Sequence, residues 1–172
     1  MKNKIIAFVI IVVIGLTVFM VSDFKNEITP EELSQTFIEY VFTATPESMS
    51  KIYPGDDYSP NKEVLEKLSG LTTDEIKVSL FANRIIAMSA VVAEEFNSNV
   101  VIQDYVIKKI QENDNKTHID FEAKFIVQSL DTFQTFEYPL KGQIGMIKND
   151  EETKVFALKL FTIGILDHKY KK

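Results

Sequence analysis

The spacing of apolar residues changes once along this chain, near Val100, and that change limits the folds open to it. Before Val100, apolar side chains recur every three or four residues, which is the period of an amphipathic helix. After Val100 they alternate with polar residues, which is the period of a strand. The sequence therefore predicts an α+β domain in which several helices precede a sheet.

Turn-forming residues divide the second half of the chain into four strands with short connections, so neighbouring strands must run antiparallel as a meander. The second strand alternates strictly, which predicts one solvated face and one face buried under helices. Pro139, Gly142 and Gly145 interrupt the third strand and predict a bend that curves the sheet. The four strands are expected near residues 100–112, 117–130, 133–148 and 153–164.

The first helix of the domain has a well-marked start. Thr29 is a good N-cap, Pro30 suits the first helical position, and Glu32 completes a capping box. The same signals predict further helices beginning near Thr45 and Ser59.

A longer helix is expected to start at Thr72 and to run unbroken to about Phe96. Gly70, just before it, suits a left-handed C-cap of the preceding helix. Val78 and Phe81 belong to the long helix's apolar stripe, which predicts that both are buried.

The amino-terminal segment predicts a membrane anchor. Residues Ile5–Val21 form an uncharged apolar run preceded by Lys2 and Lys4. Seventeen residues of helix span about 26 Å, near the lower limit for a bilayer core. The lysines place the amino end in the cytoplasm, so we expect a single-pass cell-membrane protein. Residues 1–23 would be the tip and anchor, and 24–172 an extracytoplasmic domain; a cleaved signal peptide is the alternative.

Composition excludes several functions. The chain has no cysteine, hence no disulfide, thiolate site or cysteine nucleophile. Residues 24–172 carry 17 basic and 24 acidic side chains, which opposes nucleic-acid binding. Phosphate-loop, nucleophile-elbow and paired-histidine motifs are all missing from the sequence, so we expect no cofactor and no enzymatic activity. Abundant lysine with a single arginine is typical of an AT-rich bacterial genome.

The order of elements resembles a known superfamily. The segment Thr29-Pro30-Glu31-Glu32-Leu33 and the paired strands 142–148 and 153–158 are similar to those of exported nuclear transport factor 2-like proteins, over about residues 28–164. The resemblance implies a cystatin-like α+β fold with helices on a curved sheet. The anchored layout is also similar to bitopic assembly-factor subunits of type IV secretion and conjugation systems. Because the superfamily includes enzymes, binding modules and structural subunits, the fold does not select a function.

Two segments are candidate binding sites. Arg84, with Asn83, could face the sheet and bind an anionic ligand, because a guanidinium matches a carboxylate or phosphate. The alternative for Arg84 is a snorkelling side chain or an ion pair on the helix margin. Separately, exposed aromatic residues beside turns are common contact sites. Such an interaction loop is expected at Tyr53, Asp56, Asp57 and Tyr58, unless the tyrosines only pack on each other.

Histidines and carboxylates give weaker candidates. His118 and Asp120 lie on one strand face with Glu122, and two of these side chains could help bind a metal ion, although a solvated face explains the row better. His168 lies in a charged tail and is expected to be mobile and solvated.

A catalytic pair would need a buried base beside a hydroxyl group. The only candidates for such a pair are Asp104 with Tyr105 and Asp104 with Tyr138. Because Asp104 and Tyr105 are neighbours in the sequence, they must point to opposite faces of their strand.

Three functions remain open from the sequence. The first is a membrane-tethered, non-enzymatic interaction domain of an envelope complex, such as a conjugation or secretion apparatus, whose partners are envelope proteins or a second copy of itself. The second is a ligand-binding module with an open pocket between helices and sheet and with Arg84 pointing inward. Filling of that pocket by Phe81, Met88, Phe121 and Phe125 would contradict it. The third, an enzyme, requires Asp104 or Asp120 to be buried beside a tyrosine hydroxyl.

Overall fold

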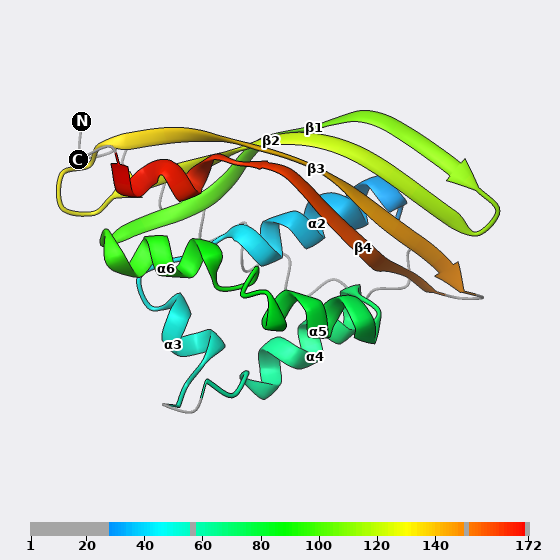
Figure 1. Cartoon of the computed structure of the whole chain (residues 1–172), viewed down its shortest axis with the longest axis horizontal. Helices are drawn as coiled ribbons and strands as arrows, with labels where there is room; N and C mark the ends of the chain where they lie inside the picture. Colours follow the sequence, from blue (N-terminus) through cyan, green and yellow to red (C-terminus); the bar gives the residue numbers. More distant parts are fainter. Residues whose placement is uncertain (1–27, 56–57, 150–151, 171–172) are drawn as a thin grey trace.

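The computed structural model describes residues 28–55, 58–149 and 152–170. Within these residues five helices precede four strands and a short 3₁₀ helix, which confirms the predicted α+β order (Figure 1). The predicted anchor, residues 5–21, lies outside the described residues. Among the residues that the structure describes, no helix is long and apolar enough to cross a membrane. The elements are α2 (Pro30–Phe42), α3 (Ser48–Ile52), α4 (Lys62–Leu71), α5 (Asp74–Ala82), α6 (Met88–Glu95), β1 (Ser98–Asn113), β2 (Lys116–Ser129), β3 (Thr135–Asn149), β4 (Glu152–Ile163) and η1 (Gly164–Tyr170).

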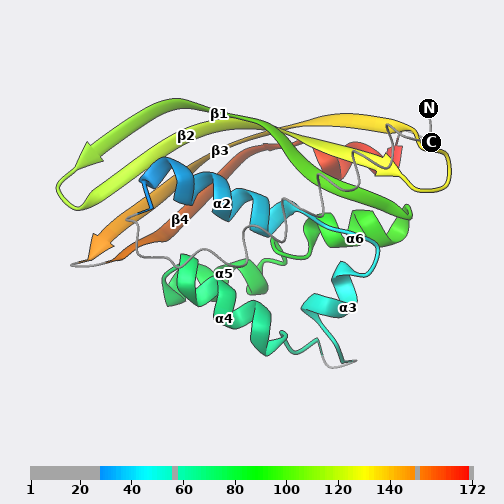
Figure 2. The same cartoon turned by 180° about the vertical axis from the view of Figure 1, so that it is seen from behind.

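The sheet is an antiparallel meander in the order β1-β2-β3-β4, as predicted. It is curved and open, and the helices cover one face of it (Figures 1 and 2). Register shifts in the β3–β4 pairing fall at Gly142 and Gly145, which confirms the predicted irregularity. At Gly142 a Cβ atom would lie 2.7 Å from the Lys159 carbonyl oxygen and 2.9 Å from the Phe121 ring. Only glycine therefore lets β2, β3 and β4 approach this closely.

Helix α2 begins as its sequence predicts. The Thr29 side chain accepts a hydrogen bond from the Glu32 backbone N–H at 3.2 Å, and the Glu32 carboxylate accepts one from the Thr29 N–H at 3.0 Å. This capping box satisfies two backbone donors that the first turn leaves without helical partners. Helix α2 then directs Phe37 and Phe42, both 0% exposed, towards the sheet.

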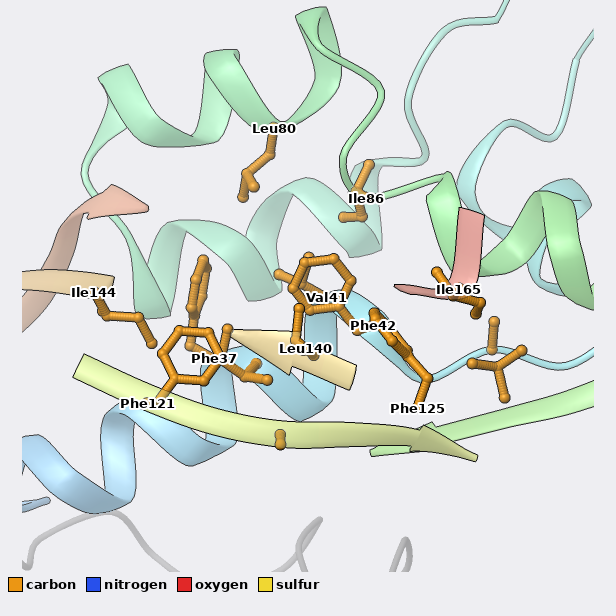
Figure 3. Close-up of a cluster of buried hydrophobic side chains, with 14 of the residues drawn as sticks. Phe37, Val41, Phe42, Leu80, Ile86, Phe121, Phe125, Leu140, Ile144 and Ile165 are labelled. Carbon is orange, nitrogen blue, oxygen red and sulfur yellow. The ribbon is translucent and has the colours of Figure 1, made fainter. Parts of the chain in front are cut away.

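A continuous apolar core fills the space between helices and sheet. The rings of Phe42 and Phe125 meet edge to face with centroids 5.6 Å apart. Burial of each such side chain contributes about 1.5–3 kcal/mol. Figure 3 shows the core side chains from α2, β2 and β3 pointing towards one another, with Leu80 and Ile86 closing it from the helical side.

The predicted long helix from Thr72 to Phe96 is wrong, because it is two helices. Helix α5 ends at Ala82 and α6 begins at Met88. Arg84, between them, has φ of 54°, in the left-handed region, which ends the α-helical path. The break lets Ile86 and Ala87, each 4% exposed, reach the core, so the apolar period continues although the helix does not.

Three other helix boundaries differ from the prediction. Helix α4 starts at Asn61, whose side chain accepts a hydrogen bond from the Glu63 N–H at 2.8 Å, and not at Ser59. It also continues through Gly70 to Leu71, and Gly70 has no positive φ. The N-cap of α5 is Thr73 and not the expected Thr72, because the Thr72 hydroxyl donates to the Leu68 carbonyl instead of capping the next helix.

Candidate interaction surface

The metal candidates on β2 do not converge. Asp120 accepts a hydrogen bond from the Gln143 side chain at 2.7 Å, and His118 packs edge on against the Phe156 ring. Glu122 pairs with Lys108 and Lys141, which lower the pKa of its carboxyl. Among the described residues no three histidine or carboxylate side chains are placed to hold a metal ion.

The nominated catalytic residues do not form an acid–base pair. Asp104 is exposed on the outer face and forms an ion pair with Lys124 at 3.0 Å. Tyr105 points to the inner face, as predicted, where its hydroxyl donates to the Ser34 hydroxyl at 2.8 Å. Burial raises the pKa of Tyr105 to about 12. Asp120 is half-buried on the outer face, so neither it nor Asp104 meets the condition set for an enzyme.

A hollow of about 370 Å³ lies on the outer face of the sheet beside these residues. Its charged side chains already pair with each other. Lys124 bridges Asp104 and Glu137, each at 3.0 Å, across three strands. Because the charged side chains of the hollow pair with one another at a solvated surface, they are not available as a set of groups for binding a ligand.

His168 is buried, and the prediction of a solvated tail is wrong. Its side chain is 7% exposed, and Nδ1 lies 2.6 Å from the Tyr138 hydroxyl oxygen. Its ring meets those of Phe96 and Phe136 edge on, with centroids 4.5 Å and 5.2 Å apart. The helices leave this end of the inner sheet face uncovered, and η1 covers it. The sequence did contain a signal for this burial. Ile165 and His168 are three residues apart and therefore lie on one side of a 3₁₀ turn.

The proposed ligand anchors lie on the surface and not in the core. Asn83 and Arg84 are both exposed. Asn83 donates from its side chain to the Ser79 carbonyl at 3.1 Å and so closes the end of α5. The expectation that Arg84 points inward is therefore wrong, because the left-handed turn directs it out of the helical layer.

The space that an inward-pointing ligand anchor would need is also occupied. Phe121 and Phe125 are buried in the core, and Phe81 and Met88 pack against it from the helices. This filling is the result that contradicts an open pocket between helices and sheet.

The two candidate segments instead meet on one surface. The Tyr53 ring lies edge on to Phe81 at 6.2 Å and to Tyr58 at 6.1 Å, measured between ring centroids. Arg84 is close enough to act on Tyr53. Burial raises the pKa of the Tyr53 hydroxyl, and the Arg84 charge partly offsets that rise. Tyr53 and Tyr58 were predicted as contacts, whereas Asp56 and Asp57 lie outside the described residues.

Helix α5 adds an apolar side chain that sequence analysis assigned to the core. Val78 is 64% exposed and Tyr58 is 70% exposed. Val78 is three residues before Phe81, so both lie on the same side of α5. The predicted stripe missed this because it treated residues 72–96 as one straight helix. We call Tyr53, Tyr58, Val78, Phe81 and Arg84 the aromatic–arginine surface.

Backbone strain occurs twice at this surface. Tyr58 and Arg84 both have φ of 54°, a left-handed conformation that is uncommon for residues other than glycine, asparagine and aspartate. Each costs on the order of 1 kcal/mol. Strained positions of this kind concentrate at sites of function, where packing holds them.

The guanidinium of Arg84 has no carboxylate partner in the described part of the chain. Every ion pair found there uses lysine. The surface thus combines the exposed ring of Tyr58, the half-buried rings of Tyr53 and Phe81, and a cation with no carboxylate partner among the described residues. Tyrosine and arginine are enriched at contact hot spots.

Comparison with known proteins identifies no family. No protein-family model matches the chain, and no curated protein matches it. Among solved structures, an IcmL-like type IV secretion system protein from Legionella pneumophila is similar over 76% of this chain and 88% of its own, with 11% identity and a TM-score of 0.49. The intermembrane-space region of the chloroplast protein ARC6 is similar over 78% of this chain and 98% of its own, with 6% identity and a TM-score of 0.42. At these scores neither likeness establishes what this chain does.

Proposed function

We propose that the chain is a membrane-tethered interaction domain, a non-enzymatic subunit or accessory of a bacterial envelope complex. The aromatic–arginine surface is the observation that carries this proposal. It gathers half-buried and exposed aromatic side chains and an exposed arginine at one place, while the described cavities and clusters offer no arrangement equipped for catalysis. A surface that binds another protein does not require a catalytic group.

The amino-terminal sequence supports the location. An anchor at Ile5–Val21, with Lys2 and Lys4 before it, leaves the domain outside the cytoplasm. The resemblance of this layout to bitopic assembly factors makes a secretion or conjugation apparatus the first complex to test. Envelope proteins, or a second copy of the chain, are the partners we expect.

In-membrane cross-linking of the full-length protein at native expression, followed by mass spectrometry, tests the proposal. Tyr58→Ala should reduce the recovery of other envelope proteins several-fold. The matched control is Phe133→Ala, because Phe133 is 72% exposed and has φ of 59°, close to Tyr58 in both respects. Recovery of the chain with no cross-linked partner, or equal losses from both variants, would contradict the proposal.

A further inference from the structure

The structure assigns a partner chemistry to the aromatic–arginine surface. We propose that it binds a carboxylate side chain within an apolar segment of a partner protein, with the Arg84 guanidinium on the carboxylate. Val78, Phe81 and Tyr53 would contact the apolar neighbours of that carboxylate. This inference rests on the proposed function and adds the chemistry of the partner to it.

The backbone of Arg84 is fixed, and its side chain is free to reach a partner. Its backbone N–H donates to the Phe81 carbonyl at 3.0 Å, which ties the turn to the end of α5. The side chain is exposed and has no ion pair among the described residues. A guanidinium can form two parallel hydrogen bonds with one carboxylate, which an ammonium group cannot do.

The neighbouring rings strengthen such a pair. The rings of Tyr53 and Phe81 pack against each other near Arg84, whose backbone bonds to Phe81. A partner segment in contact with these rings would exclude water from one side of the ion pair. Ion pairs that are partly shielded from water are stronger than fully exposed ones. The rings and Val78 also supply apolar area, which a lone charge contact lacks.

The charge pattern favours a single carboxylate over a polyanion. The chain has a formal net charge of −6, and Arg84 is its only arginine. Nucleic acids and anionic membranes are bound by clusters of cations, because many charges must be neutralised together. One cation among aromatic and aliphatic side chains instead matches one acidic residue flanked by apolar ones, which is a protein segment.

A photo-cross-linker at the edge of the surface provides the test. Full-length protein with Val78→p-benzoylphenylalanine is irradiated in intact membranes, and the captured peptide is mapped by mass spectrometry. We expect that peptide to contain an aspartate or glutamate. Arg84→Glu should reduce capture on the order of tenfold, and Arg84→Lys less, because lysine keeps the charge but not the paired donors. Changing the mapped carboxylate to lysine should restore capture by Arg84→Glu.

The control is Lys109→Glu, which makes the same charge change at an exposed residue of β1 and should leave capture unchanged. Equal capture by wild type and Arg84→Glu would overturn the carboxylate proposal. If Tyr58→Ala still abolished capture in that case, the proposed interaction function would stand without it. If no peptide at all were captured at position 78, both proposals would fail.

Discussion

Replacement of Tyr105 by phenylalanine should change stability in opposite directions at neutral and alkaline pH. The Tyr105 hydroxyl donates to Ser34 at 2.8 Å, and the Ser34 hydroxyl in turn donates to the Glu31 carbonyl at 2.8 Å. Tyr105→Phe removes the first bond and leaves the second intact, so no buried donor is left unpaired. At pH 7 we therefore expect a loss of about 1 kcal/mol in the free energy of unfolding.

Alkaline pH should reverse that difference. The pKa of Tyr105 is raised from 10.0 to about 12 in the folded protein. As the pH rises past 10, the unfolded state loses the tyrosine proton first, which favours unfolding. The free energy of unfolding of the wild type therefore falls between pH 10 and 12. The fall is at most about 2.7 kcal/mol, and it is smaller because the Tyr105 ring is only half-buried. Phenylalanine has no such proton, so Tyr105→Phe should become the more stable protein before pH 12.

Urea unfolding of the detergent-solubilised full chain, followed by circular dichroism across this pH range, measures both effects. Tyr40, whose pKa is also raised to about 12, is present in both proteins, so its contribution cancels in the difference. Tyr58→Phe, at a 70% exposed position, is the control and should follow wild type. A stability difference between wild type and Tyr105→Phe that stays constant from pH 7 to the alkaline limit would refute the reasoning.

Four further predictions concern packing and topology. Gly142→Ala should destabilise by about 1–3 kcal/mol in the same urea assay, because its Cβ would meet the Lys159 carbonyl at 2.7 Å. Gly70→Ala, inside α4 with nothing within 4 Å, should instead stabilise by about 0.5–1 kcal/mol. His168→Ala should undock η1, seen as faster proteolysis near the carboxyl terminus than in wild type. Because the chain has no native cysteine, an impermeant maleimide on intact cells should label Phe133→Cys and not Lys2→Cys; the reverse pattern would contradict the proposed orientation.

Local signals were sufficient for much of the fold. The capping box at Thr29 and Glu32 and the turn residues between strands act over a few positions, and the elements they predict are in place. Gly142 and Gly145 also predicted the irregularity of β3, because a missing side chain in a strand indicates that another backbone approaches closely. The predicted meander needed nothing more than short connections.

Other features depend on contacts between distant parts of the chain. The break at Arg84 keeps apolar residues buried on both sides, so periodicity alone gives the same pattern for one helix or two. Burial of His168 depends on Phe136 and Tyr138, about thirty positions earlier, whose rings the helices leave uncovered. The contact between Tyr53 and Phe81 likewise depends on how the helices pack. The sequence indicated the Tyr53 loop and the Arg84 segment as separate candidates and not that they lie side by side.

The arrangement of the domain relative to its proposed anchor bears on what a partner must be. Helix α2 begins at the end of the sheet where the β1–β2 and β3–β4 turns lie, whereas α3 lies towards the other end, on the side of the helical layer away from the sheet (Figures 1 and 2). With an anchor ending at Val21, the chain to Ile28 can reach at most about 25 Å. Such an anchor would keep the start of α2 within that reach of the bilayer, and α3, which lies towards the other end of the sheet, could lie farther from it (Figures 1 and 2). A partner that binds the aromatic–arginine surface would therefore meet it through a segment outside the membrane and not through a transmembrane helix.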